Sequence, residues 1–424
     1  MNRENEIFTR SLMARVCNSD SLAEALEIFT QAGPLLDGCK FVFAAKSGAA
    51  PGFAVNRTFS GGASIRSLFN TERVVVLDTE TVREMRSGKA TYPIDYSISL
   101  DTQAVSYLEP FVSGKSIARL PTDMKEVFDF IARDDVSVDP IPYMLENVHN
   151  LHDQGAADRI YAKLRVYEIL RTLDTQWLQS RGEARSVLSD PDLTKRAQEH
   201  IARMFADRDD DRFTRGLTFR YQFVYCHLLQ MALIQLSSPK ASLANKMLQF
   251  LEFCDSVMAI MNGRETALAR AYFERGQDLT FFGKIQKGKP DLFRLLGGMA
   301  WDLWHVRQLE EAMTFKPAPQ ARYFFPALLT FDKRLIEVID LYPLKACAFK
   351  EGQSEPMPVF DGDWFDLVAT GEAAKHSIQE RFFSSEARAS RDARRDGVKS
   401  NIEEITKGLE TKLSQVALVN CPSH

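Results

Sequence analysis

The sequence lacks the cysteine and histidine patterns of a disulfide-rich or zinc-binding protein. Its six cysteines are widely scattered, they form no Cys-x-x-Cys pair, and only seven histidines accompany them, so neither a disulfide framework nor a zinc site is indicated. An excess of positive charge is also missing, because 53 Lys and Arg face 57 Asp and Glu. Any contact with nucleic acid must therefore be local, and a reducing cytoplasm is the expected location.

The chain also has no apolar run long enough to span a membrane comfortably. Its most apolar stretch, residues 221–236, is short for that purpose and carries His227 and three glutamines, so we expect a buried helix there. The charged residues 1–17 contain no uninterrupted apolar core of the kind found in signal peptides. We therefore expect neither export nor membrane association.

What the sequence does contain is a mixture of strand and helix patterns. The β-branched run at 74–77 and the alternating run at 96–100 predict strands. Repeated apolar residues at 124–131 predict a helix, and the Asp-Pro-Ile-Pro sequence at 139–142 predicts a turn. Residues 158–275 are nearly free of proline and rich in Leu, Ala, Met, Arg and Glu, which is typical of several packed helices.

These changes of character predict an α/β fold in which a central parallel sheet is flanked by helices and interrupted by a mainly helical insertion. The length of 424 residues is enough for more than one packed unit. The predicted segments are an N-terminal appendage at 1–72, the first part of the core at 73–157, the insertion at 158–275, the second part of the core at 276–360 and a charged helical tail at 361–424.

Four acidic residues stand where a cation site is expected. Asp101 follows the predicted strand at 96–100, and Glu146 lies in an amphipathic helix. Asp302 stands among apolar residues of a predicted helix, and Asp332 follows the apolar run Leu-Leu-Thr-Phe. Carboxylates gathered at the carboxyl ends of parallel strands bind hard cations such as Mg²⁺. Such cations activate water and neutralise charge during phosphodiester hydrolysis.

Taken in order, the phrases around these acids resemble those of PIN-domain nucleases, which include the toxin ribonucleases of bacterial toxin and antitoxin pairs. In that family an Asp followed by Thr or Ser ends the first strand and a Glu lies on an early helix. A further Asp opens a phrase like D-x-L-H-V-A, and the last Asp follows a strand in a phrase like T-x-D-K. The corresponding phrases here are SLDT at 99–102, YMLE at 143–146, WDLWHV at 301–306 and TFDK at 330–333.

The resemblance implies a PIN-like core, with the long segment between the second and third phrases looped out as the helical insertion. It implies a metal-dependent endonuclease that uses a metal-activated water, acts on RNA rather than DNA and works as a toxin or defence effector, with an antitoxin or regulatory protein as a possible partner. The acids that would bind Mg²⁺ or Mn²⁺ and carry catalysis are Asp101, Glu146, Asp302 and Asp332. Lys333 and Arg334 are expected to touch substrate phosphate, and His305 to pack nearby rather than act as a base.

The residues leave three alternatives open. Asp78 ends a strand of its own in the phrase Val-Val-Val-Leu-Asp-Thr and competes with Asp101 for the first position. Each acid also has a structural interpretation: Asp101 and Asp332 as turn or helix N-cap residues, Glu146 as a solvated helix residue, and Asp302 as a helix-surface acid or an ion-pair partner of Arg307. The chain would then be a non-catalytic helical interaction protein. The third alternative is a DNA-directed nuclease that becomes active only with a partner, because nothing in the sequence reads bases or the 2′-hydroxyl.

Overall fold

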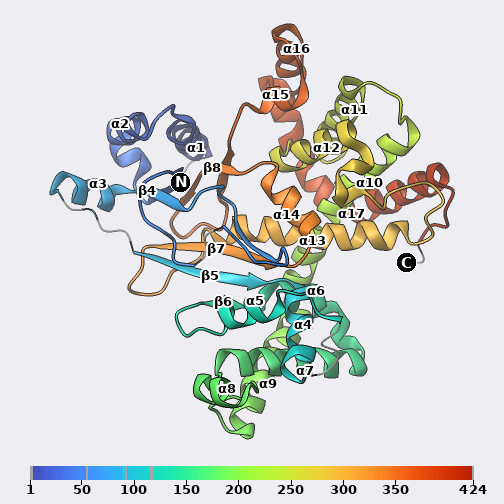
Figure 1. Ribbon diagram of the computed structural model, residues 1–424. Helices are drawn as coiled ribbons and strands as arrows, with labels where there is room; N and C mark the ends of the chain where they lie inside the picture. The colour runs from blue at the N-terminus through green and yellow to red at the C-terminus, as the bar shows by residue number, and fades with distance from the viewer. Residues whose placement is uncertain (1–2, 54–55, 89, 91–92, 115–118, 423–424) are drawn as a thin grey trace. The chain divides into compact units, whose positions relative to one another are not determined.

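The computed structural model describes residues 3–53, 56–88, 90, 93–114 and 119–422. The chain divides into two compact units, each built from segments that are distant in the sequence. The first unit contains Met1–Asp211, His305–Ile339 and Pro343–Phe360, and the second contains Arg212–Trp304, Asp340–Tyr342 and Asp361–His424. The described strands belong to the first unit, whereas the second is helical (Figure 1). The mixed α/β class expected from the sequence is confirmed.

One sheet of the first unit is antiparallel, with the strand order β4-β1-β8-β9. Its strands are β1 (Cys39–Ala45), β4 (Arg73–Leu77), β8 (Leu344–Lys350) and β9 (Met357–Phe360). The helices α1 (Arg3–Asn18) and α2 (Leu22–Ala32) cover it through a shared apolar core. In that core the ring of Phe29 meets the ring of Phe41 edge-on at 5.7 Å. The predicted strand at 74–77 is confirmed as β4.

The other sheet has the order β2-β3-β7-β5-β6 and is mixed rather than wholly parallel. Its strands are β2 (Arg57–Thr58), β3 (Ser64–Ser67), β5 (Ile94–Leu100), β6 (Val138–Asp139) and β7 (Tyr323–Thr330). The central strand β5 runs parallel to both β6 and β7, while the short hairpin of β2 and β3 adds antiparallel pairing beyond β7. Residues 1–72 thus contribute strands to both sheets.

A helix begins within a few residues of the end of each parallel strand, and a polar residue stands at each junction, where such residues favour a helix start. Helix α4 (Thr102–Val112) follows β5, and α6 (Ile141–Asn147) follows β6. Figure 1 shows α4 and α6 at the carboxyl end of β5. Among the described residues, the remaining helices of this unit are η1 (Gly33–Leu36), α3 (Thr79–Arg86), α5 (Met124–Ile131), η3 (Val148–His152), α7 (Gln154–Arg171), α8 (Thr175–Arg181), α9 (Asp190–Asp209), the part of α13 (Leu292–Ala312) from His305 on, and α14 (Lys333–Asp340) as far as Ile339.

The second unit is a helical assembly. Among the described residues, its helices are α10 (Asp211–Ser237), α11 (Leu243–Ser256), α12 (Gly263–Arg275), η4 (Gly276–Asp278), η5 (Thr280–Phe282), the first part of α13 (Leu292–Ala312), α15 (Trp364–Val368), α16 (Glu372–Phe383) and α17 (Ser385–Ala417). The apolar stretch 221–236 lies within α10 and is largely buried, so the predicted buried helix is confirmed. Among the described residues, none of the helices combines the length and the apolar character that crossing a membrane requires.

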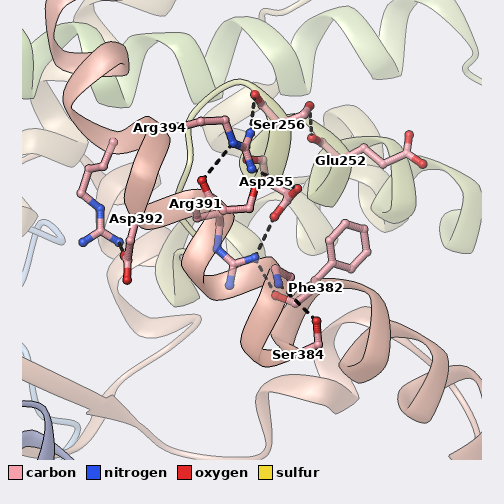
Figure 2. A network of polar contacts seen from close by, with 11 residues as sticks. Glu252, Asp255, Ser256, Phe382, Ser384, Arg391, Asp392 and Arg394 are labelled. Carbon is pink, nitrogen blue, oxygen red and sulfur yellow. Dashed lines mark hydrogen bonds and ion pairs between the residues drawn. The ribbon is translucent and has the colours of Figure 1, made fainter.

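The charged segment near the start of α17 is anchored within the second unit. Arg391 is buried and donates to Asp255 Oδ1 at 2.7 Å and to the carbonyl oxygen of Phe382 at 2.6 Å. One turn later, Arg394 donates to the carbonyl oxygens of Asp255 and Ser256, both at 2.8 Å (Figure 2). These arginines therefore tie α17 to the end of α11, where the exposed carbonyl groups of a helix favour cations.

Candidate active site

Two of the predicted site residues follow neighbouring parallel strands at the same edge of the mixed sheet. Leu100, the last residue of β5, pairs with Leu329 of β7. Asp101 comes next in the chain, and its backbone N–H donates to the Leu329 carbonyl oxygen at 3.2 Å. Asp332 stands just beyond the end of β7 at Thr330. Ligands of open α/β sheets gather at such an edge, so the fold brings this part of the prediction together.

Asp101 is buried at the start of α4. Its carboxylate accepts the backbone N–H of Ala104 at 2.6 Å and thereby caps the helix. Burial leaves the side chain in a poor environment for charge and raises the pKa of Asp101 to about 6, even though the Thr330 hydroxyl and the Ala104 N–H act in the opposite direction. The nearby Glu146 carboxylate adds to the increase. Asp101 is therefore an acid whose charge lacks full compensation.

Glu146 lies on α6, a helix that begins after β6, and is close enough to Asp101 for its charge to raise the pKa of Asp101. The Thr102 hydroxyl donates to Glu146 Oε2, and His305 Nε2 lies 3.5 Å from the same oxygen. Burial alone raises the pKa of Glu146, but the His305 ring and the Thr102 hydroxyl outweigh it, so this pKa lies below its ordinary value. His305 itself is 3 % exposed. The histidine expected only to pack nearby is thus a direct neighbour of a predicted acid.

Asp332 is linked to Asp101 through Thr330 and is held by its own cation. The Asp332 N–H donates to Thr330 Oγ1 at 3.0 Å, while the Thr330 side chain also hydrogen-bonds the Asp101 carboxylate. Arg334 donates to Asp332 through Nε at 2.9 Å and Nη2 at 2.5 Å. Burial raises the pKa of Asp332, but this guanidinium outweighs it and lowers the pKa below its usual value. Arg334 therefore neutralises Asp332 within the site.

The second cation expected to touch substrate packs against a glycine loop. Gly62 has a φ of +100°, and a Cβ at that position would stand 2.2 Å from Lys333 Cε. Because the end of the lysine is flexible and can move, the positive φ, which L side chains rarely adopt, is what favours glycine here. The role of Lys333 and Arg334 in substrate binding stays a prediction. Arg334 donates hydrogen bonds to Asp332 in this structure.

The structure separates the two competitors for the first position. Asp78 caps α3 by accepting the Thr81 N–H at 2.6 Å, and its other oxygen accepts the Tyr323 hydroxyl at 2.6 Å. Tyr323 is the first residue of β7, so Asp78 lies toward the amino end of that strand, whereas Asp101 lies at the carboxyl end. Asp101 is therefore the one at the edge that also holds Asp332.

Asp302 lies on α13, in the part of that helix that belongs to the second unit, and its side chain is partly buried. His305, three residues later, is the first α13 residue of the other unit. The structural alternatives for Asp302, an ion pair with Arg307 or a place on the helix surface, also stay open. The prediction that Asp302 joins the other acids stays a prediction.

One carboxylate at the same edge was missed by the sequence reasoning. Asp139, expected in a turn, is the last residue of β6 and pairs with Ser99 in the parallel register. It accepts the hydroxyls of Ser97 and Ser99 and the Ile141 N–H. Burial raises its pKa despite these donors. The available signal was the short alternation Val-Ser-Val-Asp at 136–139, which is typical of a strand.

Within the part of the chain that the structure describes, no group of three or more His, Cys, Asp or Glu side chains is placed to hold a metal ion. A smaller donor set is present, because Glu146 is close enough to Asp101 for its charge to raise the pKa of Asp101. Mg²⁺ is usually bound by one or two carboxylates together with water and substrate phosphate. The oxygen donors of this acid pair therefore fit Mg²⁺ or Mn²⁺ in that sparse mode.

Comparisons with known proteins found no match to this chain. No protein-family model matches the chain, and neither a curated protein nor a solved structure matches it. The likeness to PIN-domain nucleases therefore depends on the four sequence phrases alone. Function has to be argued from the site, because a fold does not by itself imply an activity.

Proposed function

We propose that this chain is a metal-dependent nuclease that hydrolyses phosphodiester bonds at the carboxyl edge of β5 and β7. The observation that carries the proposal is the acid pair of Asp101 and Glu146, in which burial raises the pKa of Asp101 to about 6. A partly uncompensated buried carboxylate costs stability, and strongly shifted acids are common where a protein binds or reacts with a ligand. A cation bound by both carboxylates would remove that cost.

In this proposal the protein supplies orientation for the two acids. The Ala104 N–H and the Thr330 hydroxyl fix the Asp101 carboxylate, and the Thr102 hydroxyl with His305 fixes Glu146. When bound, Mg²⁺ or Mn²⁺ would supply an activated water and neutralise charge on the phosphate. Arg334 keeps Asp332 ionised at the edge of the site, and substrate phosphate would compete for the same guanidinium.

The finer parts of the proposal come from the resemblance to PIN-domain nucleases. They are the preference for RNA over DNA, endonucleolytic cleavage, a role as a toxin or defence effector in the cytoplasm, and an antitoxin or regulatory protein as partner. A substrate comparison tests the first two directly. End-labelled single-stranded RNA and DNA of the same sequence are incubated with the protein and Mn²⁺, and the product ladder distinguishes internal cleavage from removal of end nucleotides.

The central test is hydrolysis by the wild-type chain and by Asp101→Asn. The substitution keeps the size of the side chain and a capping oxygen for α4 while removing the charge that would hold a cation. We expect Mn²⁺-dependent cleavage by the wild type, its loss with EDTA, and a decrease of at least about 100-fold in Asp101→Asn, the scale on which catalytic groups act. Glu146→Gln should behave in the same way.

Asp78→Asn is the matched control, because Asp78 has the same position relative to its strand and helix. It should cleave at the wild-type rate per folded molecule. Asp302→Asn and Asp332→Asn test the two remaining acids predicted from the sequence, and a loss in both would support their inclusion. Full activity in Asp101→Asn, with the fold unchanged by circular dichroism, would remove the proposal.

A second candidate is a non-catalytic interaction protein in which these acids serve as structural groups. The observation in its favour is that Asp101 and Asp332 both accept backbone N–H groups at helix starts, while Arg334 already neutralises Asp332. The two candidates differ in their response to cations. A nuclease with a preformed site is stabilised by Mn²⁺, whereas acids that act only as caps leave the unfolding temperature unchanged.

A further inference from the structure

A pocket of about 400 Å³ lies in the first unit, lined by residues of α6, η3 and α7. Tyr143 of α6 is buried at this place, and Asn147 is its neighbour one turn later. Asn150 belongs to η3, and Arg159 and Lys163 come from α7. The lining also includes His152 and the Asp153 carboxylate. Its two cations and two amides supply the hydrogen-bond donors that an anion needs.

The two cations are positioned to act together. Arg159 and Lys163 stand one turn apart on the same face of α7. Lys163 Nζ donates to the Ser106 hydroxyl at 2.8 Å and lies 5.4 Å from the centre of the Tyr143 ring, which fixes the ammonium group. Arg159 is largely exposed, and its contact with Asp153 is long at 4.0 Å. Such an exposed pair contributes little, so Arg159 is available to a stronger anion.

The pocket adjoins the acid pair of the candidate active site. Tyr143 lines the pocket, and Glu146 stands one turn away on the same helix. Lys163 is near enough to Glu146 to lower the pKa of that carboxyl group. Its partner Ser106 lies on α4, the helix that Asp101 caps. A polyanionic substrate approaching two carboxylates needs cations nearby to offset repulsion. Lys163 lies near Glu146, and Arg159 stands one turn away from Lys163 on α7.

We propose that this pocket binds a backbone phosphate of the nucleic-acid strand, next to the bond that is hydrolysed. The inference rests on the proposed function and adds the binding position of the substrate strand. Lys163 and Arg159 provide the charge. The amides of Asn147 and Asn150 provide further donors, since each has one N–H in a described hydrogen bond and a second one to offer. Contacts to phosphate fix register without reading sequence.

The test separates binding from cleavage. Fluorescence anisotropy measures the affinity of the full chain carrying Asp101→Asn, in EDTA, for a labelled single-stranded oligonucleotide at several salt concentrations. Adding Arg159→Ala and Lys163→Met should weaken binding about tenfold and reduce the salt dependence by about two phosphate contacts. Arg159→Ala alone, at an exposed position that the fold does not require, should weaken binding about threefold and remove about one contact.

Arg165→Ala is the matched control, because Arg165 lies two residues from Lys163 on α7 and pairs with Asp190 instead. It should leave both the affinity and the salt dependence unchanged. Competition by inorganic phosphate distinguishes a strand from a free anion. If millimolar phosphate displaces the oligonucleotide fully, the pocket is a free-phosphate site and the inference is wrong.

Unchanged affinity and salt dependence in the double variant would overturn the inference, as would the absence of any oligonucleotide binding by the parent. The inference and the proposed function can fail independently of each other. If the wild type never cleaves but Lys163 and Arg159 still determine strand binding, the phosphate pocket stands and the nuclease proposal fails. If the wild type cleaves while both substitutions leave binding unchanged, the nuclease proposal stands and the phosphate pocket is wrong.

Discussion

Two segments of the first unit share the local sequence Leu-Asp-Thr after a strand, and both use the Asp to begin a helix. Asp78 and Asp101 each accept the backbone N–H three residues later at 2.6 Å. Their pKa values nevertheless move in opposite directions. Burial raises the pKa of both, but for Asp78 the Thr81 N–H and the Tyr323 hydroxyl outweigh it, whereas Asp101 remains near 6.

The difference comes from groups that are distant in the sequence. Asp78 receives the Tyr323 hydroxyl and lies near the Arg322 guanidinium, so its charge is compensated. At Asp101, burial outweighs both the Thr330 hydroxyl and the nearby His305 ring, and the Glu146 carboxylate adds a smaller increase, so its charge is not fully compensated. The same local motif thus forms a compensated helix cap after β4 and a buried acid with a raised pKa at the carboxyl end of β5. This contrast is why Asp101 is the better candidate for a ligand-binding role.

The largest expected effect concerns the stability that the two caps provide. Asp78→Ala should destabilise the protein by about 3 kcal/mol, because it removes a helix cap and leaves the buried Tyr323 hydroxyl without its acceptor. Asp101→Ala should cost about 1 kcal/mol or less, since loss of its cap is offset by removal of an opposed charge. Urea denaturation of the metal-free protein at pH 7.5 measures both values.

Tyr323→Phe sharpens this comparison, because it removes only the donor to Asp78. It should cost about 1 kcal/mol in the wild type and should increase the stability of Asp78→Ala, where it removes a hydroxyl that has lost its acceptor, as a double-mutant cycle would show. Equal costs for the two alanine variants would mean that the environments of the two acids do not differ in energy.

The next effect is on the pH dependence of stability, to which Asp101 and Asp78 should contribute with opposite signs. Because the pKa of Asp101 is raised in the folded state, its contribution to stability is fully present below its ordinary value of 3.8 and is lost as the pH rises through about 6. Asp101→Asn should therefore equal the wild type near pH 4 and exceed its stability by roughly 2 kcal/mol at pH 8. Denaturation curves in EDTA across this range measure the difference.

Asp78→Asn is the control for that series. The pKa of Asp78 is lowered in the folded state, so its contribution is present above the ordinary value of 3.8 and is lost as the pH falls below it. Asp78→Asn should accordingly be less stable than the wild type by a constant amount between pH 5 and 8. A difference for Asp101→Asn that is equally constant would contradict the raised pKa.

The local part of this arrangement could be predicted from the sequence. Alternating apolar residues identify β5, and an Asp followed by helix-forming residues identifies the start of α4, because both signals lie within a few residues. Asp332 after β7 is predicted by the same reasoning. Asp302 shows the limit of this reasoning, because a carboxylate within an apolar helical phrase is consistent with either a metal ligand or a helix-surface acid.

The long-range part could not be predicted. The pairing of β5 with β7, which sets Asp101 beside Thr330, joins segments separated by most of the chain. Asp139 was assigned to a turn from its local sequence. The serines that donate hydrogen bonds to it lie on β5, and only the parallel pairing of β6 with β5 brings them to Asp139. Lys163 looked like one cation among many in a helical stretch, and only the packing of α7 against α4 places it near Glu146.

The smallest effect is a cation-dependent change in unfolding temperature, and it bears most directly on whether the parallel edge binds metal. At tenfold excess over its dissociation constant, Mn²⁺ should stabilise the wild type by about 1.4 kcal/mol, which raises the unfolding temperature by about 2–4 °C for a unit of this size. The increase should be lost in Asp101→Asn and retained in Asp78→Asn. Differential scanning fluorimetry with Mn²⁺ and with EDTA measures it.

The same shift should depend on pH in a way that identifies the ligand. Cations bind the ionised carboxylate, and Asp101 has a pKa of about 6. The Mn²⁺ effect should therefore be present at pH 7.5 and much reduced at pH 5, where Asp101 is mostly protonated. A shift of equal size at both values, or one that Asp101→Asn retains, places the cation elsewhere. In that case Asp101 is a cap like Asp78, and the interaction-protein alternative accounts for the acids.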